Sequence, residues 1–68
     1  MNKNLLYYEM HEKGITVAEL CEYLGISRSS FYRKCNGKAE FSLTEVRKIV
    51  EYVKPRNASA IFFIPEVS

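Results

Sequence analysis

The 68-residue chain has no aspartate and a single histidine, His11, so it is poor in the side chains that most enzymes use. It also has no glycine-rich loop of the kind that holds phosphate groups. The side chains that are present cannot supply a nucleophile, a base and a group that orients the base. We therefore expect no catalytic residues, no cofactor and no small-molecule substrate.

Cysteine is scarce as well, since the chain contains only Cys21 and Cys35. Two cysteines are too few for a disulfide framework. Two cysteines and one histidine also fail to complete the four ligands of a structural zinc ion. The sequence therefore predicts no metal site, and Cys21 is interpreted as a small core residue.

Long apolar runs are absent too. The longest, residues 60–64, is far below the roughly 20 residues that span a bilayer. The N-terminus has no basic segment followed by an apolar run, so no secretory signal is predicted. We expect a cytoplasmic protein with no membrane partner. At this length the chain, residues 1–68, is expected to form one domain with a small core.

Positive charge is concentrated in the middle of the chain, although the net charge is only +2. Residues 1–26 contain two basic and four acidic residues, residues 27–38 contain four basic and none acidic, and residues 39–68 contain four of each. A solvated helix surface usually mixes the two signs, so the central excess indicates an anionic partner. Four charges alone are weak support for nucleic acid.

Apolar spacing and helix-capping residues predict an all-α fold, a compact bundle of four to five short helices. The expected helices cover residues 3–13, 16–24, 27–35 and 42–53, with a last short turn after Asn57. Thr16–Glu19 and Ser42–Glu45 both have the form of a capping box, in which a hydroxyl and a glutamate bond each other's backbone N–H groups. These two boxes mark helix starts.

The C-terminal third of the chain contains two apolar patterns. The fourth helix is expected to turn a stripe toward the core, formed by Leu43, Val46, Ile49, Val50 and Val53. The isoleucine and phenylalanine residues of segment 60–64 also favour β pairing. A helical turn is preferred there, because Asn57 is a suitable cap for one.

Two short helices separated by a glycine turn make residues 16–35 a candidate helix-turn-helix. Gly25 permits the positive φ that reverses the chain. Cys21 is small where the helices approach each other, and Ile26 and Phe31 are expected to lie inside. The exposed side of the second helix would then carry Arg28, Ser29, Tyr32 and Arg33. Arginine can read guanine edges and hydroxyls can bind phosphates or bases, as a helix in the DNA major groove requires.

Residues 15–38, with the sequence ITVAELCEYLGISRSSFYRKCNGK, resemble the helix-turn-helix domains of phage repressors and Cro-like proteins, the XRE-type family. The resemblance continues through the expected fourth helix and covers roughly residues 5–64. Residues 31–38 are most similar to small prophage-encoded members from low-GC Gram-positive bacteria. The resemblance implies a lambda-repressor-like fold and a DNA-binding transcriptional regulator, acting in the bacterial cytoplasm or nucleoid.

The same resemblance implies that the recognition helix, residues 27–35, enters the major groove of double-stranded DNA. Base contacts are expected from Arg28, Ser29, Tyr32 and Arg33. Phosphate contacts are expected from Thr16, Val17, Ser27, Ser30, Lys34, Asn36 and Lys38. Two positions depart from the family pattern. Many members have a polar residue at the position of Val17, so here only the backbone N–H of Val17 is left to donate to a phosphate. Many have an apolar residue at the position of Lys34, so the direction of the Lys34 side chain stays open.

We expect a homodimer on a palindromic operator, because one short recognition helix reads few base pairs and two half-sites lie about 34 Å apart. The apolar tail, residues 58–68, is the predicted dimer contact through Ile61, Phe62, Phe63 and Ile64. Deleting residues 60–68 would then leave a folded monomer. The alternative is a protein-interaction module on the same fold, such as an anti-repressor or antitoxin-like partner, that does not bind DNA.

Overall fold

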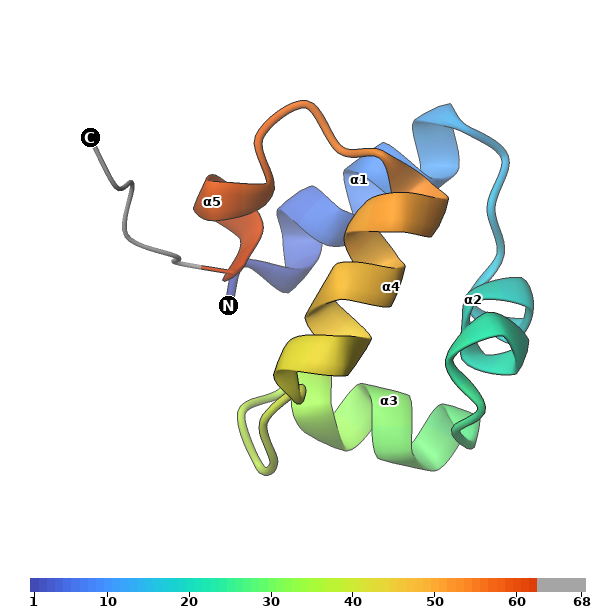
Figure 1. Cartoon of the computed structure of the whole chain (residues 1–68), viewed down its shortest axis with the longest axis vertical. Helices are drawn as coiled ribbons and strands as arrows, with labels where there is room; N and C mark the ends of the chain where they lie inside the picture. Colours follow the sequence, from blue (N-terminus) through green and yellow to red (C-terminus); the bar gives the residue numbers. More distant parts are fainter. Residues whose placement is uncertain (63–68) are drawn as a thin grey trace.

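The computed structural model describes residues 1–62, which form five helices and no strand (Figure 1). The helices are α1 (Lys3–Glu12), α2 (Val17–Leu24), α3 (Arg28–Cys35), α4 (Leu43–Val53) and α5 (Ala58–Phe62). The predicted all-α fold is confirmed. The helical turn preferred to a strand is also confirmed as far as Phe62, while Phe63 and Ile64 lie outside the described residues.

Each of the first four helices begins after a residue whose side chain accepts a hydrogen bond from a backbone N–H of the first turn. These residues are Asn2, Thr16, Ser27 and Ser42. Both predicted capping boxes are present. The Thr16 N–H donates to Glu19 Oε1 over 3.0 Å, and the Ser42 N–H donates to Glu45 Oε1 over 2.8 Å. Asn57 caps α5 as expected, since its Oδ1 accepts from the Ala60 N–H over 3.1 Å.

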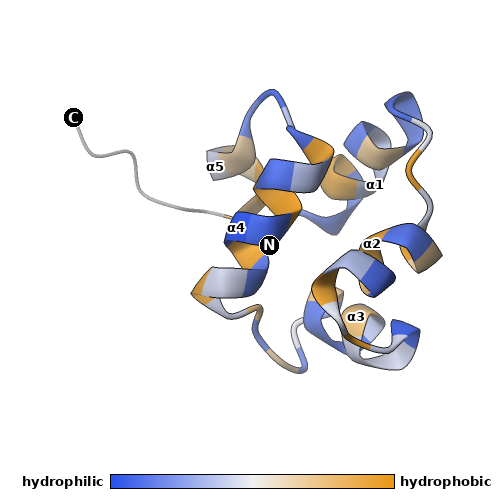
Figure 2. Ribbon diagram, turned by 45° about the vertical axis from the view of Figure 1, so that its right-hand side comes forward, coloured by the Kyte–Doolittle hydropathy of each residue, from blue (hydrophilic) through white to orange (hydrophobic). Residues whose placement is uncertain are grey.

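One core of ten buried apolar residues holds the described helices together. It consists of Leu6, Met10, Leu20, Cys21, Leu24, Phe31, Cys35, Ile49, Val53 and Ile61. Figure 2 shows hydrophobic segments of α1, α2 and α4 in the region that these helices enclose. The ring of Phe31 lies 5.8 Å from that of Phe41 and 6.5 Å from that of Tyr7, centroid to centroid. These contacts attach α3 to α1 and to the loop that leads into α4.

The two ends of the described chain pack against each other. The Asn2 N–H donates to the Ile61 carbonyl over 2.7 Å, and α5 lies against α1 (Figure 1). The Ile61 side chain is 0% exposed. Ile61 therefore belongs to the core of the single chain, and the prediction that it forms a dimer contact is wrong. Phe62 is only half-buried.

A lysine joins the end of α1 to the end of α4. Lys13 Nζ donates to the Val53 carbonyl over 2.6 Å and to the Lys54 carbonyl, and it lies 3.4 Å from Glu9 Oε2. The last carbonyls of a helix have no partner within it, so the ammonium group satisfies them. Lys54 adopts a left-handed conformation with φ 51° and ends α4 directly before Pro55, the predicted stop.

The predicted apolar stripe of α4 is confirmed only in its later turns. Ile49 and Val53 are buried, and Val46 and Val50 are half-buried. Leu43, however, is 72% exposed, so its assignment to the core is wrong. Leu43 is the first residue of α4, and this end of the helix projects beyond the core. Leu43 therefore lies in solvent, although it continues the apolar pattern to which the buried Ile49 and Val53 belong.

Candidate nucleic-acid interface

The turn between α2 and α3 is built around a left-handed glycine. Gly25 has φ 73°, and its N–H donates to the Cys21 carbonyl over 2.8 Å. The Ile26 N–H donates to the same carbonyl over 3.1 Å. The chain reverses within these residues, and α3 packs against α2. The predicted helix-turn-helix is thus formed, with Cys21 buried and Ile26 half-buried at the junction.

The second helix of this motif, α3, has a buried side and an exposed side. Phe31 and Cys35 are buried, one turn apart. The exposed side chains, which we call the outer face of α3, are Arg28, Ser29, Tyr32 and Arg33. Their spacing places them on one side of a helix with 3.6 residues per turn. The structure therefore brings all four predicted base-contacting residues together on one accessible surface.

The two arginines of the outer face have no acidic partner within residues 1–62. The ion pairs of that part of the chain are Lys13–Glu9 and Lys34–Glu45. Tyr32 lies between the arginines in sequence and is 44% exposed, with its ring edge-on to Phe31 at 5.9 Å. An arginine without a protein carboxylate presents five N–H donors in a planar fork, which suits guanine edges and phosphate oxygens.

Lys34 faces the protein and not the outer face of α3. Its Nζ lies 2.7 Å from each carboxylate oxygen of Glu45, and 5.8 Å from the centre of the Phe41 ring. The phosphate contact predicted for Lys34 would compete with this ion pair, because its ammonium is engaged with α4. The pair ties the C-terminal end of α3 to the N-terminal end of α4.

Glu45 has two partners, and they determine its charge state. Burial raises the pKa of a carboxyl, but the hydrogen bonds from Lys34 and the Ser42 backbone N–H outweigh it, helped by the Lys34 charge. The net result is a pKa of Glu45 below its ordinary value. Glu45 therefore stays ionised while it caps α4 and holds Lys34.

Acid is expected to weaken the link between Lys34 and Glu45. Because the pKa of Glu45 is lower in the folded state, its stabilisation is complete above the ordinary glutamate pKa of about 4.3 and is lost as the pH falls through the folded value. Glu45→Gln should lower the free energy of unfolding by about 1 kcal/mol at pH 7 and by less at pH 3. Urea unfolding at both pH values measures this, with the exposed Glu51→Gln as the control. An equal loss at the two pH values would contradict it.

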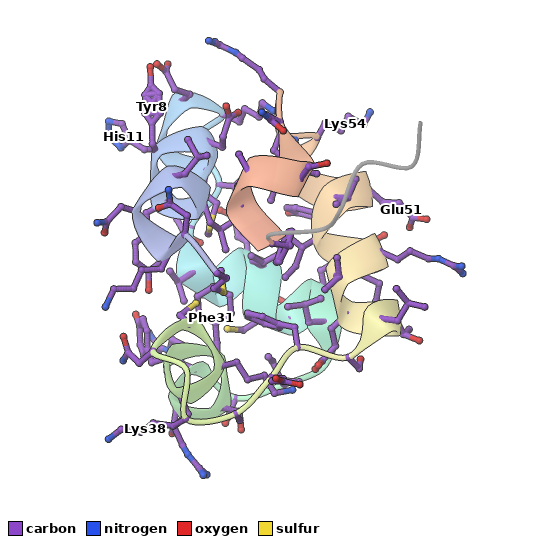
Figure 3. The ribbon with its side chains drawn as sticks, turned by 90° about the vertical axis from the view of Figure 1, so that its left-hand side faces the viewer. Tyr8, His11, Phe31, Lys38, Glu51 and Lys54 are labelled. Atoms are coloured by element: carbon purple, nitrogen blue, oxygen red, sulfur yellow. The ribbon has the colours of Figure 1, made fainter. Side chains whose placement is uncertain are left out.

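Two predicted phosphate contacts lie where α3 ends. Asn36 Oδ1 accepts a hydrogen bond from Lys3 Nζ over 2.6 Å. Lys38 is exposed, and its backbone N–H donates to the Arg33 carbonyl over 2.9 Å, which keeps it next to the outer face. Figure 3 shows the Lys38 side chain pointing away from the body of the molecule, at the opposite end from Tyr8. Sequence analysis missed Lys3, because 33 residues separate it from Asn36.

The hydroxyl groups assigned to phosphate already have partners in the protein. Thr16 Oγ1 donates to Glu19 Oε1 over 2.9 Å. Ser27 Oγ lies 3.1 Å from Ser30 Oγ and also accepts from the Ser30 N–H. The first N–H groups of a helix have no partner inside it. The backbone N–H of Val17, at the start of α2, is therefore a more available donor than the Thr16 hydroxyl.

The cysteines and their neighbours support α3 from inside. Both are free and buried. Burial raises the pKa of each thiol, so both remain protonated at neutral pH. Burial together with the adjacent Cys35 raises the pKa of Tyr7 to about 12. Within residues 1–62, no group of three or more histidine, cysteine or acidic side chains is arranged to hold a metal ion, and none of the helices there is long and apolar enough to cross a membrane.

Two helices joined by a left-handed glycine turn, with a basic exposed face on the second helix, define a helix-turn-helix DNA-binding domain. The sequence matches the family model of the Cro/C1-type HTH DNA-binding domain over residues 6–54. The chain belongs to this family and is a DNA-binding transcription regulator, which confirms the predicted membership of the XRE-type helix-turn-helix family. Domains of this family are typically non-enzymatic. No curated protein and no solved structure gave a significant match.

Proposed function

We propose that the chain is a sequence-specific regulator of the repressor or Cro-like kind, of phage or prophage origin, that inserts α3 into the major groove of its operator. The observation that carries this proposal is the outer face of α3, where Arg28 and Arg33 are exposed and have no acidic partner among the described residues. The site of action is the bacterial cytoplasm or nucleoid.

Each residue of the interface has a proposed role. Arg28 and Arg33 read guanine through paired N–H donors, with Ser29 and Tyr32 at adjacent base edges. The phosphate backbone is bound by Lys38, Asn36, the start of α2 at Thr16 and Val17, and the start of α3 at Ser27 and Ser30. Lys34 is left out of this set, because it holds α3 in position through Glu45.

The regulator acts as a homodimer on a palindromic operator. A helix of eight residues contacts few base pairs, so one copy alone discriminates poorly between DNA sequences. Two copies place their recognition helices in successive major grooves about 34 Å apart on one side of the duplex. The half-site spacing of a selected operator therefore reports the dimer.

The experiment that tests the proposal is a fluorescence-anisotropy titration of a random duplex pool at several salt concentrations. The wild type should bind with micromolar or weaker affinity, and the logarithm of affinity should fall linearly with the logarithm of salt, with a slope of about −0.9 per phosphate neutralised. Arg28→Ala/Arg33→Ala should reduce the magnitude of that slope by about 1 to 2 and lower the affinity at least tenfold.

The chain offers a matched control in its other two arginines. Arg47→Ala/Arg56→Ala removes the same charge from exposed positions outside α3 and should keep most of the affinity. Equal losses in the two double variants would mean that net charge, and not the outer face of α3, carries binding. A wild type that fails to bind even at low salt would favour the protein-interaction module without DNA binding.

A further inference from the structure

A positive charge from the start of α1 lies at the end of α3. Lys3 is the first residue of α1, and its Nζ donates a hydrogen bond to Asn36 Oδ1 over 2.6 Å. Both residues are exposed, and Asn36 directly follows α3. In Figure 1 the N-terminus and the end of α3 that leads into the next loop lie on the same side of the molecule. Lys3 therefore belongs to the surface around the end of α3.

Asn36 continues the outer face of α3 by one turn. It lies three residues after Arg33 and four after Tyr32, and residues with these spacings are neighbours on a helix surface. Its backbone N–H donates to the Tyr32 carbonyl over 2.9 Å, so the helical spacing is kept as far as Asn36. A charge held at Asn36 is therefore next to the side chains proposed to contact DNA bases.

The hydrogen bond also determines how the Asn36 amide is turned. An ammonium group donates and cannot accept, so the atom of Asn36 that faces Lys3 is the oxygen. The amide nitrogen of Asn36 and its two N–H donors are then left for another acceptor. The ammonium has three N–H donors and uses one of them on Asn36. The unused donors of the pair suit the oxygens of a phosphate group.

The charge of Lys3 is not neutralised within residues 1–62, where the ion pairs are Lys13–Glu9 and Lys34–Glu45. The first turn of α1 contains no acidic residue. A positive charge in the first turn of a helix is unfavourable, because it lies near the positive end of the helix dipole. Lys3 therefore contributes little to the stability of α1, and its charge is available to an anionic partner.

The backbone beside Lys3 is fixed before any ligand binds. Asn2 Oδ1 accepts a hydrogen bond from the Leu5 N–H over 3.1 Å, and the Asn2 N–H donates to the Ile61 carbonyl over 2.7 Å. These two bonds attach the start of α1 to itself and to the residue that fills the core from α5. Little of the protein has to be ordered when a ligand reaches Lys3.

We propose that Lys3 and Asn36 form one phosphate-binding site, in which the Asn36 amide donates to a backbone phosphate of the operator and the Lys3 ammonium neutralises that phosphate. Lys3 orients the amide and supplies a free charge at the end of α3, where the charge of Lys34 is already paired with Glu45. The inference rests on the proposed function, because it extends the DNA interface from the helix-turn-helix to α1.

The anisotropy titration across a salt series tests the site with Lys3→Ala. Phosphate contacts carry no sequence information, so the random duplex pool is a suitable probe. The magnitude of the salt slope should fall by about 0.9, the share of one phosphate, and the affinity at about 0.1 M salt should fall by about three- to tenfold. Lys3→Arg keeps the charge and should keep the slope.

The matched control is Lys54→Asn, which removes one positive charge from an exposed residue at the end of α4. Figure 3 shows Lys54 and Lys38 at opposite ends of the molecule, so Lys54 is remote from the proposed interface. Asparagine tolerates the left-handed conformation that this residue adopts. Lys54→Asn should leave both the slope and the affinity unchanged.

Two further measurements separate a shared site from a structural effect. Asn36→Ala should also weaken binding, and Lys3→Ala/Asn36→Ala should lose less affinity than the product of the two single losses, because the residues act together. The melting temperature of Lys3→Ala should stay within about 4 °C of the wild type, as for other surface substitutions.

Four results would overturn the site. Three of them leave the proposed function standing: equal slopes for Lys3→Ala and Lys54→Asn, a double variant whose loss equals the product of the single losses, and a large fall in the melting temperature of Lys3→Ala. The fourth is a wild type that fails to bind the pool even at low salt, which would overturn the proposed function and the site together.

Discussion

Phe31→Ala should lower the free energy of unfolding by about 3–5 kcal/mol, the usual cost of removing a buried aromatic ring. Phe31 is 0% exposed, and its ring contacts those of Tyr7, Tyr32 and Phe41. Its removal leaves a cavity between α1, α3 and the loop before α4. A domain of this size has a free energy of unfolding of roughly 3–10 kcal/mol, so this loss is a large share of the total. Each kcal/mol lost lowers the melting temperature of such a domain by about 4–8 °C, so we expect a decrease of about 12 °C or more.

The same substitution should also reduce DNA binding, although Phe31 belongs to the buried side of α3. Isolated helices shorter than about 12–15 residues are marginal in water, and α3 has eight. The helix therefore depends on Phe31 and Cys35 to stay folded against the core. Phe31→Leu, which keeps an apolar side chain in place, should lose less stability. Thermal and urea unfolding followed by circular dichroism measure both variants, and a loss below about 1 kcal/mol in Phe31→Ala would show that this ring does not anchor α3.

Ile61→Ala should lower the free energy of unfolding by about 2–5 kcal/mol, because Ile61 fills the core from α5. Ile61→Val removes one methylene at the same place and should cost only about 0.5–1.5 kcal/mol. Urea unfolding of the three proteins measures the difference. If Ile61→Ala had full stability, the docking of α5 against α1 would be wrong.

The burial of Ile61 also changes what a truncation should do. Deleting residues 60–68 removes Ile61 and the carbonyl that accepts from the Asn2 N–H, so the product should be destabilised and not the folded monomer expected from the sequence. Deleting only residues 63–68 keeps both and should preserve the fold. A stable product of the longer deletion would restore the idea that the whole tail serves only in dimer formation.

Much of the local structure of this protein could be predicted from its sequence, because it depends on residues that are close together in the chain. Thr16 with Glu19, and Ser42 with Glu45, mark helix starts because the partners lie three residues apart and need no other part of the chain. Gly25 marks the turn for the same kind of reason, since its φ of 73° favours glycine in any context. The outer face of α3 follows from these signals, because a known helix start and one buried residue, Phe31, determine which side chains point outward.

Contacts between distant segments decided the rest. The Lys34 side chain points toward α4 because it forms an ion pair with Glu45 there. The periodicity of α3 alone carries no information about that partner. Leu43 fits the apolar period of α4 but extends past the core, while Ile61 lies in an apolar run that looks like a free tail but packs against α1. The sequence by itself determined the helices, the glycine turn and the outer face of α3, because these depend on residues a few positions apart. Only the tertiary structure decided which apolar side chains are buried and which charged side chains are paired within the chain. Burial and pairing depend on what distant parts of the molecule place beside each side chain.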